Sequence, residues 1–123
     1  MTAPTTNSDP QAPRYGLRMT RADEGSEAVV RLHGELELAT AALARDEVKR
    51  LLAADCERIV VDLRALDFLD STGIQMLVEA HERCRAHGRS LILLLSPGQV
   101  HRTLDVCGLL DVLDHATPEA MAA

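Results

Sequence analysis

Asp70-Ser71-Thr72-Gly73 is the stretch that decides the fold, because it joins two segments with different periodicities. The apolar run Ile59-Val60-Val61 precedes it and predicts a buried strand. Apolar residues at helical spacing follow it, beginning with Ile74 and Leu77. The stretch therefore predicts a strand-to-helix turn. Such a turn places small hydroxyl residues at a helix N-terminus, where unpaired backbone N–H groups and the helix dipole favour negative charge.

Ser71 is a candidate phosphorylation site in this turn, since a phosphate there would add about −1.5 to −2 charges to one face of the domain. Ser, Thr and Asp are also the ordinary N-cap residues of helices. On these four residues alone, capping is the favoured explanation. The pattern around the turn has to decide between the two functions.

The segments before the turn predict a hairpin and a helix. Period-2 patterns over 15–20 and 30–33 predict two antiparallel strands joined by a polar turn over 21–27. The segment 35–38 could extend the second strand. Thr40 is a plausible N-cap for a helix whose apolar stripe runs through Ala44, Val48, Leu51 and Leu52.

The segments after the turn predict alternating helices and strands. The helix from Ser71 runs to about Ala86, and a second helix follows Ser96-Pro97. Apolar runs predict a buried strand over 58–63, just before the turn, another over 91–95 after it, and a last short strand at 110–113. The order β-β-α-β-α-β-α-β predicts a single α/β domain. Its sheet should be mixed, mostly parallel and of about five strands, with helices packed on it.

The composition limits both the domain count and the partners. The 123 residues fit one domain over 14–116, with a proline-rich disordered tail at 1–13 and a polar tail at 117–123. Only Tyr15 and Phe68 are aromatic, the net charge is −6, and no element carries a Lys/Arg cluster. Nucleic acid and anionic membrane surfaces are therefore not expected as partners. No run reaches the roughly 18–20 apolar residues of a membrane span, and a cytoplasmic protein is expected.

The cysteines and histidines predict no metal site. Cys56, Cys84 and Cys107 are widely spaced and odd in number, which favours reduced thiols, with Cys84 and Cys107 on apolar helix faces. His81 and His87 share a predicted helix but are six residues apart, and no carboxylate stands at ligand spacing. We expect His81 to be a hydrogen-bonded residue at the edge of the core.

Several catalytic classes lack their required residues. The chain has no G-x-S-x-G elbow, no D-[ST]-G, no P-loop and no G-x-G-x-x-G. Asp62 ends an apolar strand, as the phosphoacceptor of a two-component receiver does. A receiver also needs an acidic pair and a lysine after its last core strand, and Lys49 is the only lysine and lies in a predicted helix. We expect no catalytic residue and no cofactor.

Three motifs occur in order along the chain. Gly34-Glu35-Leu36-Glu37 has the form G-[DE]-[LI]-D, with Glu37 in place of Asp. The stretch 62–73 has the form D-L-x(n)-[FY]-[LIM]-D-S-[ST]-G, and the segment 94–109 is a strand end followed by a helix and Gly-Leu. Together they resemble the STAS family over residues 15–116, and within it the small single-domain anti-sigma-factor antagonists. The middle motif is the specific one.

The resemblance implies partner switching. The unphosphorylated antagonist would bind an anti-sigma factor that is a serine kinase, and so release a sigma factor. Phosphorylation would end the interaction, and a serine phosphatase would restore it. Ser71 aligns with the phosphorylated serine, and Thr72 is the second candidate. The partner-binding surface is expected around the two strand-to-helix turns, with Met76 exposed; its residues would be Glu35, Leu36, Glu37, Asp70, Thr72, Gly73, Gln75, Met76 and Glu79.

Two other classes stay open. The chain could be a STAS subunit docked on a membrane transporter assembly, with Ser71 only a helix cap. It could also be an enzyme or ligand-binding protein on this sheet, but no convergent group of titratable residues is visible. The sequence leaves the oligomeric state and the identity of the sigma factor open.

Overall fold

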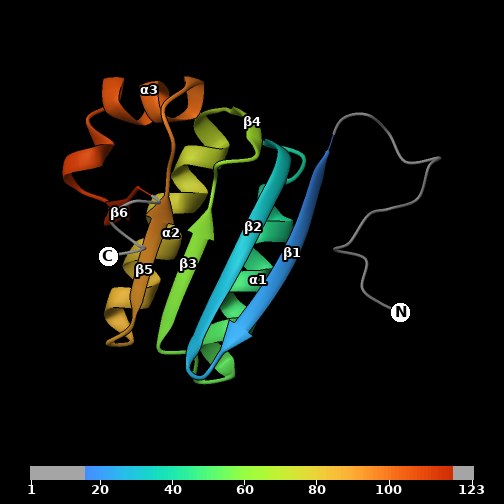
Figure 1. Ribbon diagram of the computed structural model, residues 1–123, viewed down its shortest axis with the longest axis vertical. Helices are drawn as coiled ribbons and strands as arrows, with labels where there is room; N and C mark the ends of the chain where they lie inside the picture. The colour runs from blue at the N-terminus through green and yellow to red at the C-terminus, as the bar shows by residue number, and fades with distance from the viewer. Residues whose placement is uncertain (1–15, 118–123) are drawn as a thin grey trace.

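The strands and helices follow one another in nearly the predicted order. The computed structural model describes residues 16–117, so the predicted tail at 1–13 and most of that at 117–123 lie outside the described residues. Figure 1 shows the described elements, whose bounds are β1 Leu17–Glu24, β2 Glu27–Leu36, α1 Ala41–Ala53, β3 Arg58–Asp62, β4 Leu66–Leu69, α2 Ser71–Ala86, β5 Ser90–Leu94, α3 Gln99–Val106, the 3-10 helix η1 Leu109–Asp111 and β6 His115–Ala116.

The sheet is mixed, as predicted, and its strand order is β1-β2-β3-β5-β6. Among the strands of residues 16–117, the β1–β2 pair is antiparallel and the remaining pairs are parallel. The predicted polar turn over 21–27 is wrong, because β1 continues to Glu24 and the turn lies at Gly25-Ser26. Polar residues suit the later part of β1 since it is an edge strand with a solvent-exposed face, and Gly25 takes the positive φ that the tight turn needs.

Two short elements near the ends of the sheet differ from the prediction. The four-residue strand β4 was not predicted, and it adds a sixth strand by pairing with the end of β2. The predicted strand at 110–113 is also wrong. Residues Leu109–Asp111 form a 3-10 helix, Leu113 packs into the core, and the last strand is His115–Ala116. The left-handed residue Gly108 ends α3 and starts this change of direction.

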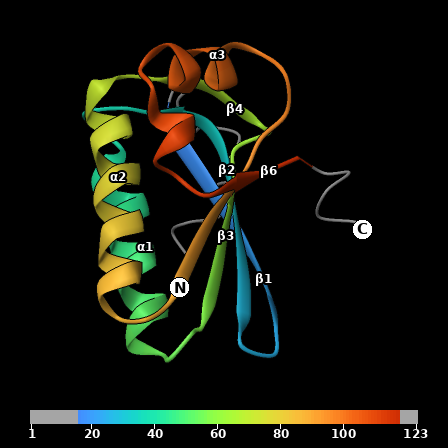
Figure 2. The ribbon, with the colours of Figure 1, turned by 90° about the vertical axis from the view of Figure 1, so that its left-hand side faces the viewer.

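One face of the sheet is covered by helices. Figure 2 shows α1 and α2 on the same side of the sheet, while α3 lies at one end of it. The α2 helix packs on β5 and against α1, and α3 packs on β4. The core between sheet and helices is aliphatic, as the near absence of aromatic residues requires, and includes Leu32, Ile59, Val61, Leu77, Leu91 and Leu93.

Gly34 marks the point where β2 bends toward the candidate site. The pairing register between β2 and β4 shifts between Gly34 and Glu35, which is a β-bulge. Gly34 has a φ of +103°, and a Cβ atom there would lie 2.2 Å from the Gly16 carbonyl oxygen. Only glycine fits this position, which gives a physical reason for the first residue of the Gly34-Glu35-Leu36-Glu37 motif.

Candidate functional site

Asp70 organises the turn that carries Ser71. It is the N-cap of α2 and has extended backbone geometry, and its Oδ1 accepts a hydrogen bond of 2.9 Å from the Gly73 N–H. Its Oδ2 accepts a second hydrogen bond, of 3.2 Å, from the Leu38 N–H in the loop between β2 and α1. One carboxylate therefore caps a helix and also holds a loop that lies 32 residues away in sequence.

Gly73 allows the first turn of α2 to approach the end of β2. A Cβ atom at this position would lie 2.3 Å from the Leu36 carbonyl oxygen and 2.8 Å from Leu69 Cδ1. The Asp70 N–H also donates to the Leu36 carbonyl, at 3.3 Å. The glycine of the Asp-Ser-Thr-Gly stretch is thus required by close backbone packing rather than by an unusual φ.

Ser71 is the first residue of α2 and is exposed, whereas Thr72 is half-buried. Because Asp70 supplies the cap, the Ser71 side chain is not needed for capping. The first-turn N–H groups and the helix dipole favour an anion at this position. The site therefore presents an accessible hydroxyl where a phosphate would be tolerated by the helix.

The loop between β2 and α1 forms the other half of the site. Thr40 occupies the N-cap position of α1, but its side chain makes no cap hydrogen bond, so the predicted capping role is wrong. Its hydroxyl instead donates to the Glu35 carbonyl, at 2.7 Å, and accepts from the Glu37 N–H, at 3.0 Å. Glu37 Oε1 accepts from the Ala39 N–H, at 2.6 Å, which turns the chain outward. These bonds fix the loop that Asp70 holds against α2.

Two apolar side chains in these segments are exposed, and neither is among the contact residues predicted from the sequence. Leu38 is 77% exposed in the loop, beside the Asp70 carboxylate, and Phe68 is 42% exposed on β4. From the sequence, the segment 35–38 could extend the second strand. The strand ends at Leu36 instead, so Leu38 turns to solvent.

Three predicted contact residues are buried. Leu36 and Met76 are 0% and 1% exposed, and Gly73 is buried as well. The expectation of an exposed Met76 is therefore wrong. The physical reason is the position of the buried stripe on α2, which runs at helical spacing through Gly73, Met76, Leu77, Ala80, His81 and Cys84. The predicted stripe through Ile74, Leu77, Val78 and His81 left Met76 outside it, whereas Ile74 and Val78 are only half-buried. Leu36 is buried because it is the last residue of β2 and faces the core.

The other predicted residues lie at the surface. Gln75 and Glu79 are exposed on α2, and Glu79 Oε1 lies 3.4 Å from the Arg45 guanidinium of α1. Glu35, Glu37 and Asp70 are half-buried, and Asp67 is exposed on β4. The surface near Ser71 thus combines carboxylates with the apolar Leu38 and Phe68.

The buried carboxylate of Asp62 holds the chain between β3 and β4, just before the candidate site. Asp62, at the end of β3, is fully buried and accepts hydrogen bonds of 2.9 Å from Arg31 and 2.9–3.0 Å from Arg64, including the Arg64 N–H. Burial alone would raise the pKa of Asp62, but these hydrogen bonds, those of Arg64 first, hold it below its ordinary value. Asp62 acts as a structural anchor for the chain between β3 and β4.

Residues 16–117 contain no His, Cys, Asp or Glu cluster that could hold a metal ion. His81 is buried, and its Nε2 lies 3.4 Å from Asp114 Oδ2. Cys84 is buried, and desolvation raises the pKa of its thiol to about 11. Cys107 is exposed, contrary to the prediction of an apolar environment, because it follows the last residue of α3. None of the helices within 16–117 has the length and apolar character to cross a membrane.

Comparisons with known proteins agree with the fold. The STAS domain family model matches residues 19–120. Over 86 residues, the chain is 30% identical to an anti-sigma F factor antagonist of Paenibacillus polymyxa, covering 69% of this chain and 74% of that protein. An anti-sigma factor antagonist from Mycobacterium paratuberculosis has a similar structure, with a TM-score of 0.74 and 20% identity over 96% of this chain and 91% of that one.

The Bacillus protein SpoIIAA is similar in two states. Its unphosphorylated form, an anti-sigma factor antagonist, matches with a TM-score of 0.70, and its phosphorylated form with 0.64. Both are 22% identical to this chain, cover 85% of it, and are themselves covered over 92% and 96%. At this identity, the likeness establishes the fold alone.

Proposed function

The chain belongs to the STAS domain family, and from that premise we propose that it is an anti-sigma-factor antagonist switched by phosphorylation of Ser71. The unphosphorylated protein binds an anti-sigma factor with serine kinase activity and thereby frees a sigma factor. The kinase transfers a phosphate to Ser71, which ends the interaction, and a serine phosphatase removes it. The antagonist catalyses no step itself; it supplies a docking surface and a hydroxyl.

The observation that carries this proposal is that Asp70, and not Ser71, caps the N-terminus of α2. Asp70 caps α2, so the exposed Ser71 hydroxyl remains available to an approaching kinase. The alternative, a STAS subunit of a transporter with Ser71 as cap only, is less well supported for the same reason. That a related antagonist, SpoIIAA, occurs in unphosphorylated and phosphorylated forms also supports the proposal.

The surface near Ser71 indicates what the partner presents. Leu38, in the loop after β2, and Phe68, on β4, offer exposed apolar area, and the carboxylates of Glu35, Glu37 and Asp67 lie in the same segments. A complementary partner surface would receive Leu38 in an apolar depression and carry arginine or lysine around it. Leu38 is the expected anchor because it is the more exposed of the two apolar side chains and adjoins Asp70 through the loop hydrogen bond.

The phosphate would block docking without refolding the domain. The N-terminus of α2 tolerates a dianion, so secondary structure should be unchanged. In the complex, the same dianion would be desolvated beside the Asp70 carboxylate, which costs free energy unless the partner pairs it. The expected block is therefore electrostatic and steric.

A matched pair of charge variants tests the docking surface. Leu38→Glu should weaken binding to the purified cognate anti-sigma factor by about 10- to 150-fold, the range of an interface anchor. Ala86→Glu adds the same charge at the far end of α2, which by helix geometry lies roughly 22 Å from Ser71. This variant should leave the affinity for the anti-sigma factor unchanged. Equal affinity of both variants and wild type, with circular dichroism unchanged, would place the interface elsewhere.

A further inference from the structure

A cavity of about 490 Å³ lies at the end of the sheet opposite Ser71. It is bounded by the β1–β2 turn, the last turns of α1 and the start of β3, whereas Ser71 follows the carboxyl ends of the parallel strands (Figure 1). Its volume falls in the range of ordinary small-molecule sites. The proposed switch makes no use of this cavity.

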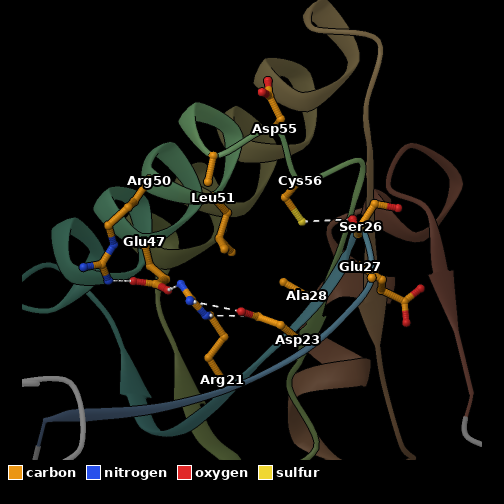
Figure 3. Close-up of a pocket in the computed structure, with 12 residues that line it drawn as sticks. Arg21, Asp23, Ser26, Glu27, Ala28, Glu47, Arg50, Leu51, Asp55 and Cys56 are labelled. Carbon is orange, nitrogen blue, oxygen red and sulfur yellow. Dashed lines mark hydrogen bonds and ion pairs between the residues drawn. The ribbon is translucent and has the colours of Figure 1, made fainter.

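The floor of the cavity is apolar and its wall is charged. Ala28, Leu51 and Cys56 form the buried floor, and the Cys56 thiol donates to the Ser26 carbonyl, at 3.3 Å. Figure 3 shows charged side chains from β1 and α1 meeting across the opening. An apolar floor below a charged wall suits a ligand with a hydrocarbon stem and one charged group.

Glu47 sets the sign of that charged group. It is only 5% exposed, on the face of α1 that otherwise buries Ala44, Val48 and Leu51. Its carboxylate contacts the Arg50 guanidinium and, at 3.2 Å, that of Arg21. A buried carboxylate is unfavourable unless cations satisfy it, so this position selects positive charge.

Arg21 shows how a cation fits the site. From the edge strand β1, its guanidinium reaches Glu47 Oε2 at 3.2 Å and the Asp23 carboxylate at 3.1 Å (Figure 3). Its side chain is 40% exposed, and ion pairs at such positions are weak. A cation from solution that also buries a hydrocarbon stem could therefore displace it.

The remaining carboxylates of the lining are already paired with arginines. Glu27 and Asp55 add two carboxylates, and Arg21 and Arg50 are the guanidinium groups of the lining. Glu27 and Asp55 pair with Arg58 and Arg89, which do not line the cavity. Once Arg21 is displaced, Asp23 and Glu47 face Arg50 alone among the lining residues, so the vacated place is acidic and disfavours an organic anion.

We propose that this cavity binds a small organic cation, a guanidinium or primary ammonium group on a short apolar stem, in the place that the Arg21 side chain now occupies between Asp23 and Glu47. The stem covers Ala28, Leu51 and Cys56, and the charged group pairs with the two carboxylates. The Arg21 side chain competes with the ligand for Asp23 and Glu47, so removing it should make the site available.

NMR titration of the full chain tests this site, with n-butylguanidinium as probe and pentanoate as the anion of similar stem. Arg21→Ala should bind n-butylguanidinium severalfold more tightly than wild type, the gain expected from removing a weakly held competitor, with amide shifts centred on Gly25, Ser26 and Ala54. Arg18→Ala removes the same charge from β1 on the opposite face of the sheet and should bind like wild type. Adding Glu47→Gln to Arg21→Ala should reduce affinity at least tenfold.

Three outcomes would overturn the proposal: Arg21→Ala binding no more tightly than Arg18→Ala, pentanoate binding as well as the cation, or no loss on adding Glu47→Gln. Should the Glu47 variant not fold, Asp23→Asn in the Arg21→Ala background serves the same purpose. Asp23 is half exposed and its loss should weaken binding severalfold. An unchanged affinity there would equally contradict the assignment.

Discussion

Replacing Asp70 should separate its two structural contributions. Asp70→Ala removes both the cap on the Gly73 N–H and the hydrogen bond from the Leu38 N–H. An N-cap contributes about 1 kcal/mol, and an exposed hydrogen bond of 3.2 Å contributes about 0.5–1.5 kcal/mol. The free energy of unfolding should therefore fall by roughly 2 kcal/mol, the sum of these terms.

Asp70→Asn is the discriminating variant. Asparagine caps helices about as well as aspartate, but its amide has one oxygen and one NH₂ group. With the oxygen on Gly73, the NH₂ group faces the Leu38 N–H, and two donors cannot bond. We expect the free energy of unfolding to fall by about 1 kcal/mol, half the loss in Asp70→Ala, because only the hydrogen bond from the Leu38 N–H is lost.

Urea denaturation followed by circular dichroism measures both losses. Asp67→Ala is the control, since this nearby acidic residue is exposed and does not cap the helix; its free energy of unfolding should stay within about 0.5 kcal/mol of wild type. If Asp70→Asn matched either wild type or Asp70→Ala, the carboxylate would not serve two partners, and the link between loop and helix would be refuted.

Further substitutions test the packing around the site. Gly73→Ala should destabilise the domain by roughly 1–3 kcal/mol in urea, because its Cβ would overlap the Leu36 carbonyl; a neutral effect would contradict the close approach. Met76→Arg should abolish cooperative unfolding or lower the free energy of unfolding by at least about 3 kcal/mol. Gln75→Arg changes the exposed neighbouring residue and should leave the free energy of unfolding unchanged. Folding lowers the pKa of Asp62, so the ionised carboxylate stabilises the domain above about pH 4, and this stabilisation is lost as the pH falls through the folded pKa. The urea midpoints of wild type and Asp62→Asn should therefore converge in acid. A difference between the two midpoints that does not change with pH would contradict this linkage.

The sequence predicts the layers of this fold well because its strands and helices have distinct periods. The continuous apolar runs at 59–61 and 91–95 are too short for helices and predict buried strands, and Asp70 and Gly88 mark the two ends of α2. These signals are local, so they can be recognised in the sequence without knowing how the elements pack together. The confirmed mixed α/β sheet follows from them.

The surface of the candidate site could not be predicted as well, because it depends on contacts between elements. Met76 lies on the buried stripe of α2 together with Gly73, Ala80 and Cys84, and these small residues give a weaker periodic signal than the apolar Ile74 and Val78, which are only half-buried. Leu38 is exposed because β2 ends at a loop held by Asp70 and Thr40, although from the sequence the segment 35–38 could extend that strand. The four residues of β4 are too few for a period to be recognised.

Mapping the phosphate by mass spectrometry, after incubation with the cognate anti-sigma-factor kinase and ATP, tests the proposed switch most directly. The account predicts a single phosphate on Ser71, its loss in Ser71→Ala, and at least tenfold weaker binding of the phosphorylated protein with unchanged circular dichroism. Ser71→Ala should bind the kinase and resist inactivation, and Ser71→Glu should bind weakly. Phosphate found only outside Ser71 and Thr72, or a Ser71→Ala protein that the kinase still inactivates, would contradict the account.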